Sequence, residues 1–489
     1  MKVLVVSSEI VPFAKTGGLA DVTGTLPKVL RRKGVEVDCI LPKYKTVTEE
    51  NHRLEPVGSR IKVPIGNREE EGNILVTRLN DDVNFYLVQN ERYFNRDFLY
   101  GTNEGDYVDN AERFIFFSRA VLEFLVHNEM RYDIIHANDW QTGLIPIYLK
   151  TIYSGHDVFS KTASVFTIHN LGYQGLFWSH DMPLTGLGWE MYTPQALEFY
   201  GKINFLKGGL VFSDVLNTVS ETYAKEIQTE EFGFGLEGVL YGERDNLFGI
   251  LNGVDYEIWS PESDFQIKAN YQSDDLSGKL VCKKDLLDEY GFSSETETPV
   301  VGIISRLVAQ KGFDILYEIG SKLAGLDVRF VVLGTGERKY EEFFREMASR
   351  YPSKFGVKIA YDDVIAHKIE AGADMFLMPS RYEPCGLNQI YSLKYGTVPI
   401  VRNTGGLADT VVDIDEQPGR GTGFKFYQYD SALLFETVAR ALSWYHKKED
   451  WKKIMIRGMG QDFSWDVSAS RYLDLYKTAL EKRGMDVYG

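Results

Sequence analysis

The sequence lacks the patterns that mark several common classes of protein. Its 489 residues include only three cysteines, Cys39, Cys282 and Cys385, and none of these forms a CxxC pair. Neither a disulfide framework nor a cysteine zinc site is therefore supported, and a reducing cytoplasm is the expected compartment. The apolar run at residues 3–6 is too short for a signal peptide or a membrane span, and we interpret it as a buried strand.

Positive charge is also scarce. The chain has 54 Lys and Arg against 70 Asp and Glu, which gives a formal net charge of −16. Such a surface repels nucleic acid and anionic lipid, so we expect neither as a partner. An anionic ligand would have to meet a local cluster of cations.

Several catalytic motifs are absent. The sequence has no Walker P-loop, no GxGxxG after its first strand, no GxSxG elbow, and no HExxH among its eight histidines. Asp413 and Asp415 have the spacing of a DxD metal site, but they lie in an acidic stretch beyond a helical pattern, and we interpret them as solvated charges. We therefore expect no metal and no cofactor.

What the sequence does contain is an alternation of apolar strands and helices that occurs twice, in a chain long enough for two to three domains. Strands are expected at residues 3–6, 35–41, 133–136, 164–169 and 214–218, and again at residues 299–304, 328–333, 357–360, 375–378 and 398–401. We predict an α/β fold with two Rossmann-like doubly wound domains, residues 1–250 and 251–463. An amphipathic helix from residue 464 should pack on one of them.

One six-residue sequence, TGGLAD, occurs at residues 16–21 and again at 404–409, each time after an apolar strand and before a helix. This placement indicates two similar domains, each with a glycine-rich helix N-terminus. In the first copy, Gly17 and Gly18 follow Lys15, and exposed backbone N–H groups there would attract a phosphate. The alternative is an ordinary glycine turn with a solvated lysine.

Cations also lie near a helix start in the second half. Arg306 and Lys311 follow the strand at residues 299–304, where cations acting alone are unfavourable. A bound diphosphate would reverse that sign, with Arg306 holding two oxygens and Lys311 supplying a point charge. The alternative is that both side chains pair with surface carboxylates.

Polar residues that follow other strands complete the candidate site. Glu383 follows the strand at residues 375–378 and is placed to act as nucleophile, base or stabiliser of an oxocarbenium ion, with a helix-capping carboxylate as the alternative. Asp139, His169 and Asn170 follow strands of the first half and suit hydroxyl groups. A lone histidine at such a position is more often structural.

Taken together, these segments resemble the bacterial glycogen synthase and plant starch synthase family of retaining glycosyltransferases. The resemblance spans nearly the entire chain and includes residues 15–22, 136–140, 166–170, 249–255, 305–312, 379–389 and 403–410. It implies two Rossmann-like domains facing across a cleft, the GT-B type, with a C-terminal helix, residues 464–489, that crosses back to the first domain. The implied reaction transfers glucose from ADP-glucose to the non-reducing end of an α-1,4-glucan such as glycogen, with retention and without a metal.

The resemblance also implies roles for individual residues. Lys15, Arg306 and Lys311 match the positions that hold the diphosphate, with the Gly18 backbone beside it, Tyr361 beside the adenine, and Gly17 as a further substrate-binding residue. The implied neighbours of the transferred glucose are Asp21, Asp139, His169, Asn252 and Glu383, with the backbone of Cys385, Gly386 and Leu387, and Asn170 is a further expected substrate-binding residue. Glu383 would stabilise the charge on the anomeric carbon.

One position departs from many related retaining transferases, which carry a second glutamate eight residues after the first. Here that residue is Tyr391, a change that glycogen and starch synthases share.

Four rival interpretations are a nucleotide-sugar epimerase on the same fold, a glucan synthase that uses UDP-glucose, a non-catalytic polysaccharide-binding protein and a glucan phosphorylase.

Overall fold

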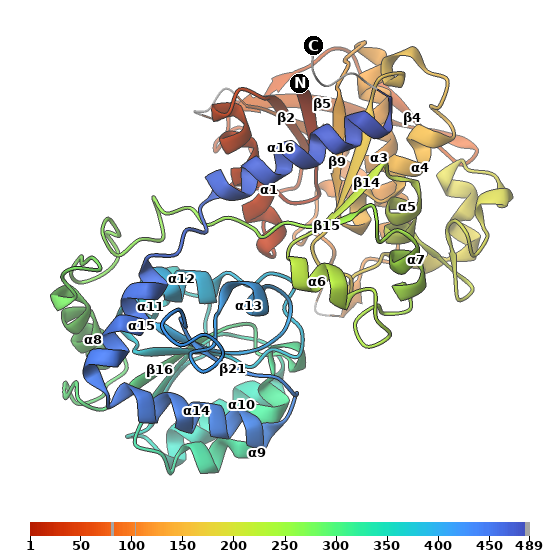
Figure 1. The fold of residues 1–489 in the computed structure, drawn as a ribbon. Helices are drawn as coiled ribbons and strands as arrows, with labels where there is room; N and C mark the ends of the chain where they lie inside the picture. Colours follow the sequence, from red (N-terminus) through yellow and green to blue (C-terminus); the bar gives the residue numbers. More distant parts are fainter. Residues whose placement is uncertain (80–82, 103, 485–489) are drawn as a thin grey trace. The chain divides into compact units, whose positions relative to one another are not determined.

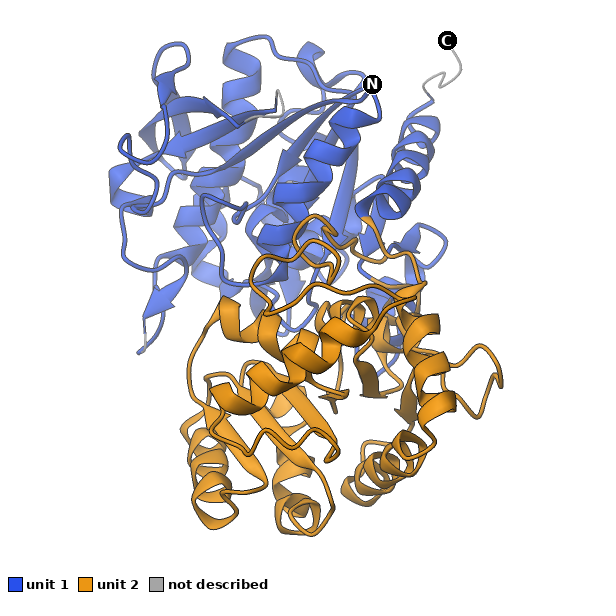
Figure 2. Ribbon diagram, turned by 90° about the vertical axis from the view of Figure 1, so that its left-hand side faces the viewer, with its two compact units in different colours: residues 1–219, 224–250, 465–489 blue, residues 220–223, 251–464 orange. Residues whose placement is uncertain are grey.

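The computed structural model describes residues 1–79, 83–102 and 104–484, and it divides the chain into two compact units (Figures 1 and 2). Unit 1, blue in Figure 2, comprises Met1–Val219, Ala224–Ile250 and Trp465–Gly489. Unit 2, orange, comprises Ser220–Tyr223 and Leu251–Ser464.

Unit 1 is built on a ten-stranded sheet in the order β15-β14-β10-β9-β1-β2-β6-β5-β3, with β4 paired to β5. The strands from β15 to β6 run parallel, whereas β5 pairs antiparallel with β6 at the edge. The strands of this sheet are β1 (Lys2–Val6), β2 (Glu36–Pro42), β3 (Glu55–Pro56), β4 (Ile61–Ile65), β5 (Arg68–Arg78), β6 (Asn84–Gln89), β9 (Ile134–Asn138), β10 (Ala163–Ile168), β14 (Val215–Thr218) and β15 (Leu247–Gly249). Smaller ladders join β7 (Gly101–Thr102) to β8 (Gly105–Asp106), and β11 (Leu176–Trp178) to β13 (Lys202–Asn204) to β12 (Glu198–Phe199).

The central strands are apolar along most of their length because helices cover both faces of a parallel sheet. The helices of unit 1 are α1 (Gly18–Arg32), α2 (Glu91–Phe94), α3 (Asn110–His127), α4 (Leu144–Lys150), α5 (Phe205–Phe212), α7 (Glu237–Gly242) and α16 (Trp465–Lys482), while α6 (Glu221–Glu226) includes residues of both units. The last helix, α16, packs beside α1 and against β9, β10 and β14 (Figure 1). Its buried Tyr472 and Tyr476 belong to the same core as Val3 and Val165.

Unit 2 is built on a six-stranded parallel sheet in the order β18-β17-β16-β19-β20-β21. Its strands are β16 (Val300–Ile304), β17 (Arg329–Leu333), β18 (Phe355–Lys358), β19 (Met375–Met378), β20 (Val398–Arg402) and β21 (Phe424–Phe426). Its helices are α8 (Ser277–Glu289), α9 (Phe313–Leu323), α10 (Arg338–Arg350), α11 (Asp363–Gly372), α12 (Asn388–Lys394), α13 (Gly405–Thr410), α14 (Ser431–Tyr445) and α15 (Lys448–Met459). The strand expected at residues 357–360 lies two residues earlier in the chain.

Both sheets reverse their strand order at one point. In unit 1 the chain adds β2 and β6 on one side of β1 and then β9, β10, β14 and β15 on the other. In unit 2 it adds β17 and β18 beside β16, and then β19, β20 and β21 on the opposite side. The prediction of two doubly wound α/β units is confirmed. Ligands of such sheets bind at the carboxyl ends of the strands that flank the reversal, here β1 with β9 and β16 with β19.

Candidate active site

In unit 2, two loops pack together at the reversal point. Residues 305–312 follow β16 and residues 379–387 follow β19, and the backbone N–H of Arg381 donates to the Gln310 carbonyl at 2.8 Å. Gly312 has φ = +83°, and a Cβ on it would lie 2.0 Å from the Pro379 carbonyl oxygen. A glycine is therefore required for this approach of the two loops.

The loop packing places Lys311 against Glu383. The Lys311 Nζ lies 2.6 Å from Glu383 Oε2, and Ser380 Oγ donates to the same oxygen at 2.9 Å. Glu383 is only 5% exposed, so solvent screens this ion pair little. The alternative that Lys311 pairs with a surface carboxylate is wrong, because its partner Glu383 is buried. The alternative that Glu383 caps a helix is also wrong, because the next helix, α12, begins only at Asn388.

Arg306 and Tyr361 lie on the surface of unit 2. The exposed Arg306 guanidinium forms no hydrogen bond or ion pair with any residue that the structure describes, so it does not pair with a surface carboxylate. Tyr361 is 85% exposed and directly precedes Asp362, the N-cap residue of α11. The exposed guanidinium of Arg306 is suited to bind a phosphate. The exposed ring of Tyr361 is suited to stack on a nucleotide base.

The turn at residues 385–387 leads from Glu383 into α12. Gly386 has φ = +70°, and Gln389 Nε2 donates to the Cys385 and Gly386 carbonyls at 3.0 and 3.1 Å. Leu387 is the N-cap residue of α12. Burial raises the pKa of the Cys385 thiol to about 12, so this cysteine is neutral at pH 7 and is not a thiolate nucleophile.

Two further residues of unit 2 bear on the site. Asn252 is buried, and its Oδ1 has no hydrogen-bond partner among the described residues, a state that costs about 1–3 kcal/mol unless a ligand hydroxyl donates to it. Tyr391, at the position of the second glutamate of related transferases, is stacked on Trp259 with ring centroids 4.0 Å apart. An aromatic contact therefore occupies the position of the second carboxylate.

In unit 1, Asp139 and His169 meet where β9 and β10 end. The His169 backbone N–H donates to Asp139 Oδ1 at 2.7 Å. Asp139 has φ = 56°, an uncommon conformation for a residue other than glycine, and such strain is concentrated at functional sites. Burial, together with a smaller contribution from the charge of Glu9, raises the pKa of Asp139 to about 7, while hydrogen bonds from the His169 and Asn170 backbone oppose the rise.

The His169 ring is neutral and has a fixed tautomer. Burial lowers the pKa of His169 to about 3, with a further contribution from the neighbouring His136. Asn138 Nδ2 donates to the Val6 and His136 carbonyls at 3.1 and 3.2 Å, so its Oδ1 is the atom that faces His169 Nε2 at 3.0 Å. The hydrogen of the imidazole is therefore on Nε2, and Nδ1 is a hydrogen-bond acceptor. His136 itself is structural, because its ring contacts Tyr476 and Thr167 in the core.

The first glycine-rich segment is open to solvent. Gly17 and Gly18 are exposed, and a Cβ on either would meet no atom within 4 Å, so a ligand has room to approach the backbone. Lys15 Nζ pairs with Asp21 at 2.7 Å on the surface. Asn170 Oδ1 accepts from the Gly172 backbone N–H at 2.9 Å, which makes it part of a local turn.

Sequence reasoning missed three residues of these two sites and misread a fourth. Glu9 and Ser380 follow strands and Asn138 is the last residue of one, all at the carboxyl edge, which is the signal that could have identified them. The expectation that Asp413 is solvated is wrong, because it is 2% exposed and pairs with Arg440 at 2.7 Å.

Within the described residues there is no group of three or more His, Cys, Asp or Glu side chains placed to hold a metal ion, and no helix is long and apolar enough to span a membrane.

Comparisons with known proteins cover both units. The family model described as starch synthase catalytic domain matches residues 2–242, and the model described as glycosyl transferases group 1 matches residues 291–456. A glycogen synthase from Koribacter versatilis is 50% identical over 483 residues, which are 99% of each chain. A glycogen synthase from Thermotoga maritima is 49% identical over 490 residues, covering 99% of this chain and 100% of the other.

Solved structures agree with these matches. The catalytic domain of starch synthase IV from Arabidopsis thaliana, bound to ADP and acarbose, is 33% identical with a TM-score of 0.89, covering 98% of this chain and 99% of that one. Sucrose-phosphate synthase from Thermosynechococcus elongatus has a TM-score of 0.61 at 16% identity over similar shares, which is a likeness of fold alone.

Two doubly wound units with polar groups at both reversal points, together with these matches, define a glycosyltransferase of the GT-B type. The chain belongs to the glycogen synthase and starch synthase family, as the sequence resemblance predicted.

Proposed function

We propose that this enzyme transfers glucose from ADP-glucose to the non-reducing end of an α-1,4-glucan, glycogen, with retention of configuration and without a metal ion. The observation that carries the proposal is the buried Lys311–Glu383 pair at the reversal point of unit 2, with the exposed Arg306 on the same loop. Glycogen synthase relatives at about half identity over the full chain, and a relative solved with ADP and acarbose, support the choice of substrates.

Unit 2 would bind the donor. Tyr361 offers a face for the adenine, while Arg306 and Lys311 bind the diphosphate. A nucleoside diphosphate leaves as a stable anion, so cations on its phosphates suffice and no acid is needed to protonate it. The backbone of residues 385–387 and the unsatisfied Asn252 Oδ1 would receive hydroxyl groups of the glucose.

The Lys311–Glu383 contact explains why the negative charge of Glu383 would become available to the anomeric carbon only when the diphosphate is bound. Without a ligand, the Lys311 ammonium neutralises the carboxylate at 2.6 Å. A diphosphate competes for that ammonium, which leaves Glu383 with negative charge when the anomeric carbon becomes cationic. The acceptor hydroxyl would then attack from the face that the diphosphate leaves, without a covalent intermediate.

Unit 1 would contribute Lys15 and the Gly18 backbone to the phosphates, while Gly17, which has no side chain, leaves them room to approach. Asp139, His169 and Asp21 would bind hydroxyl groups of the glucose, with Asn170 shaping the turn beside them. Because His169 Nδ1 is an acceptor, its partner must be a donating hydroxyl. The three cysteines are buried free thiols, which is compatible with the proposed location in the cytoplasm.

The first test is transfer of labelled glucose from ADP-glucose and, in parallel, from UDP-glucose to glycogen, with EDTA present and α-amylase digestion of the product. Incorporation from ADP-glucose that amylase releases is the expected result. Preference for UDP-glucose would overturn the donor. No incorporation from either donor, with ADP still bound, would favour an epimerase or a binding protein.

A second test addresses Glu383 directly. Glu383→Gln should lower turnover at least a hundredfold, because it removes the stabilising charge, while ADP still binds. Asp374→Asn is the matched control, since it breaks another buried ion pair of unit 2, that of Lys283 with Asp374 at 2.6 Å. The control should lose stability but retain turnover. Near-normal turnover of Glu383→Gln would refute the role of Glu383.

A further inference from the structure

Glu9 is a buried carboxylate in unit 1 that the roles above do not use. It is 4% exposed and lies in the segment between β1 and α1. It accepts four hydrogen bonds: from the Thr16 backbone N–H, from Thr16 Oγ1 at 2.6 Å, from the Gly17 backbone N–H at 3.3 Å, and from the Tyr100 hydroxyl at 2.7 Å. Among the described residues no Lys or Arg forms an ion pair with it.

The directions of these bonds matter for the glycine-rich loop. The N–H groups of Thr16 and Gly17 point inward to Glu9, so they cannot also donate to a phosphate. The backbone that remains available outward starts at Gly18, the first residue of α1. Glu9 therefore decides which amides of the loop face a ligand and fixes the backbone beside Lys15.

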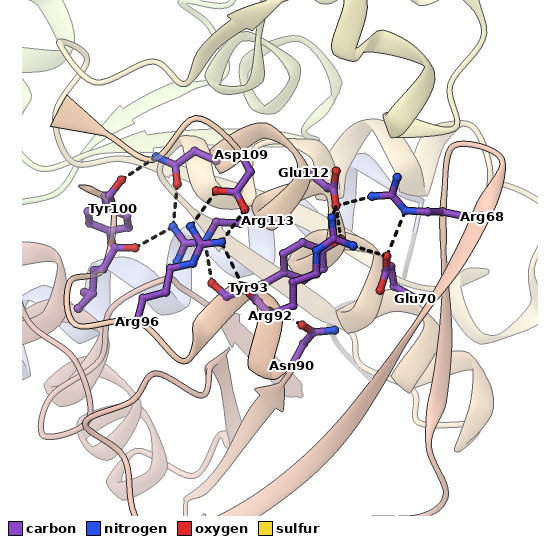
Figure 3. Close-up of polar contacts among 12 residues, drawn as sticks. Arg68, Glu70, Asn90, Arg92, Tyr93, Arg96, Tyr100, Asp109, Glu112 and Arg113 are labelled. Carbon is purple, nitrogen blue, oxygen red and sulfur yellow. Dashed lines mark hydrogen bonds and ion pairs between the residues drawn. The ribbon is translucent and has the colours of Figure 1, made fainter. Parts of the chain in front are cut away.

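Tyr100, the other donor to Glu9, is itself held firmly. Ser8 Oγ lies 2.8 Å from its hydroxyl, and Asn110 Nδ2 donates to its backbone carbonyl at 2.8 Å. The fully buried Arg113 in turn donates to Asn110 Oδ1 at 2.7 Å and to the Leu99 carbonyl at 3.0 Å, within the polar network drawn in Figure 3. This chain of contacts gives Glu9 an anchor outside the exposed loop that it holds, namely the Tyr100 hydroxyl.

We propose that Glu9 is a positioning residue for the donor diphosphate. Its carboxylate ties the Thr16–Gly17 backbone to Tyr100, and this holds Lys15 and the Gly18 amide in the geometry that receives phosphate. The inference rests on the proposed function. In the rival view, Glu9 serves only the stability of unit 1, and its loss would affect catalysis through general loosening.

The test is a double-mutant cycle on kcat/KM for ADP-glucose with the full chain. Glu9→Gln keeps the shape but places an amide group against the loop's donors, and it should lower kcat/KM about tenfold or more. In a Lys15→Ala background the same change should cost less than about threefold, because the residue that it positions is already gone. Thr16→Val, which removes a single donor, should give a smaller loss of the same kind.

The matched control is Glu123→Gln, which removes another carboxylate of unit 1 that accepts a tyrosine hydroxyl, that of Tyr153 at 2.6 Å. It should leave kcat/KM unchanged even if the melting temperature falls. Equal losses from Glu9→Gln with and without Lys15 would overturn the inference, as would normal kinetics of Thr16→Val if Glu9→Gln does not fold. Failure of the proposed function is a separate outcome, since the wild-type enzyme would then transfer no glucose.

Discussion

The two copies of TGGLAD occupy opposite environments although their letters are the same and each follows a parallel strand and contains the start of a helix. In the first copy, Gly17 and Gly18 are exposed, and a Cβ on either would have no atom within 4 Å. In the second, Gly405 and Gly406 are buried, and a Cβ on each would lie 1.9 Å from the carbonyl oxygens of Glu383 and Cys385, respectively.

The difference separates two uses of glycine. In the first copy the missing side chains leave space for a ligand at the start of α1. In the second they let the backbone of α13 pack directly under the loop that carries Glu383, and the Gly406 N–H donates to the Glu383 carbonyl at 3.1 Å. Both copies contain a helix N-terminus, as expected, but only the first is open to a ligand, whereas the glycines of the second support the loop that carries Glu383.

The largest effect is expected for Gly406→Ala. Its Cβ would meet backbone, which cannot move aside as a side chain can, so the variant should lose about 3 kcal/mol of stability. Displacement of the Glu383 loop should also abolish most turnover. Chemical denaturation and the glucose-transfer assay measure the two effects. An alanine variant with wild-type stability would show that the second copy is as open as the first.

How far sequence predicts structure can be judged from these same segments. The strands follow from local apolar runs, so the loops after β1, β9, β16 and β19 were placed correctly, whereas the reversal points became visible only from the strand order in the structure. The surroundings of the residues in these loops were not predictable, because they depend on contacts between residues far apart in the sequence. Lys311 contacts Glu383 across 72 residues, and Thr222 contacts Asp409 across 187 residues. A hexapeptide carries no signal about which backbone will lie against it.

The carboxylates near the two copies also differ, and pH should reveal it. Glu383 has Lys311 as a partner, whereas burial without a cation raises the pKa of Asp139 from 3.8 to about 7. Over that interval the folded state holds a proton that the unfolded state releases, so stability should fall as pH rises and level off above pH 7. The expected contribution is about 1 kcal/mol per pH unit.

The free energy of unfolding of wild type and Asp139→Asn is measured by denaturation at pH 5, 6 and 7. The difference between the two slopes of this free energy against pH gives the contribution of Asp139. Asp362→Asn is the control, because Asp362 also accepts a backbone N–H, that of Ile365 at 3.0 Å, at a helix N-cap in unit 2. The slope should flatten only in Asp139→Asn. An unchanged slope in that variant would mean that Asp139 is ionised throughout.

Gly17→Ala should have the complementary effect to Gly406→Ala. Its extended backbone, with φ = −156°, suits alanine, and the open space around it means that stability should change by less than about 0.5 kcal/mol. If the space belongs to the donor phosphates, the methyl group should weaken ADP binding about tenfold, or about 1.4 kcal/mol. Calorimetric titration with ADP measures this. Unchanged affinity would place the phosphates elsewhere.

The aspartate that ends each copy, Asp21 in the first and Asp409 in the second, allows the comparison with the smallest expected effect on stability. Asp409 accepts from the Thr222 backbone N–H at 3.1 Å and from its hydroxyl at 2.5 Å, whereas Asp21 pairs with the exposed Lys15 at 2.7 Å. Asp409→Asn should cost about 1 kcal/mol, since an amide oxygen replaces only part of the charged contact. Asp21→Asn should cost at most a few tenths, because exposed ion pairs contribute little, although its activity should fall if Asp21 contacts glucose. Equal losses of stability would show that the surface pair, too, holds its copy in place.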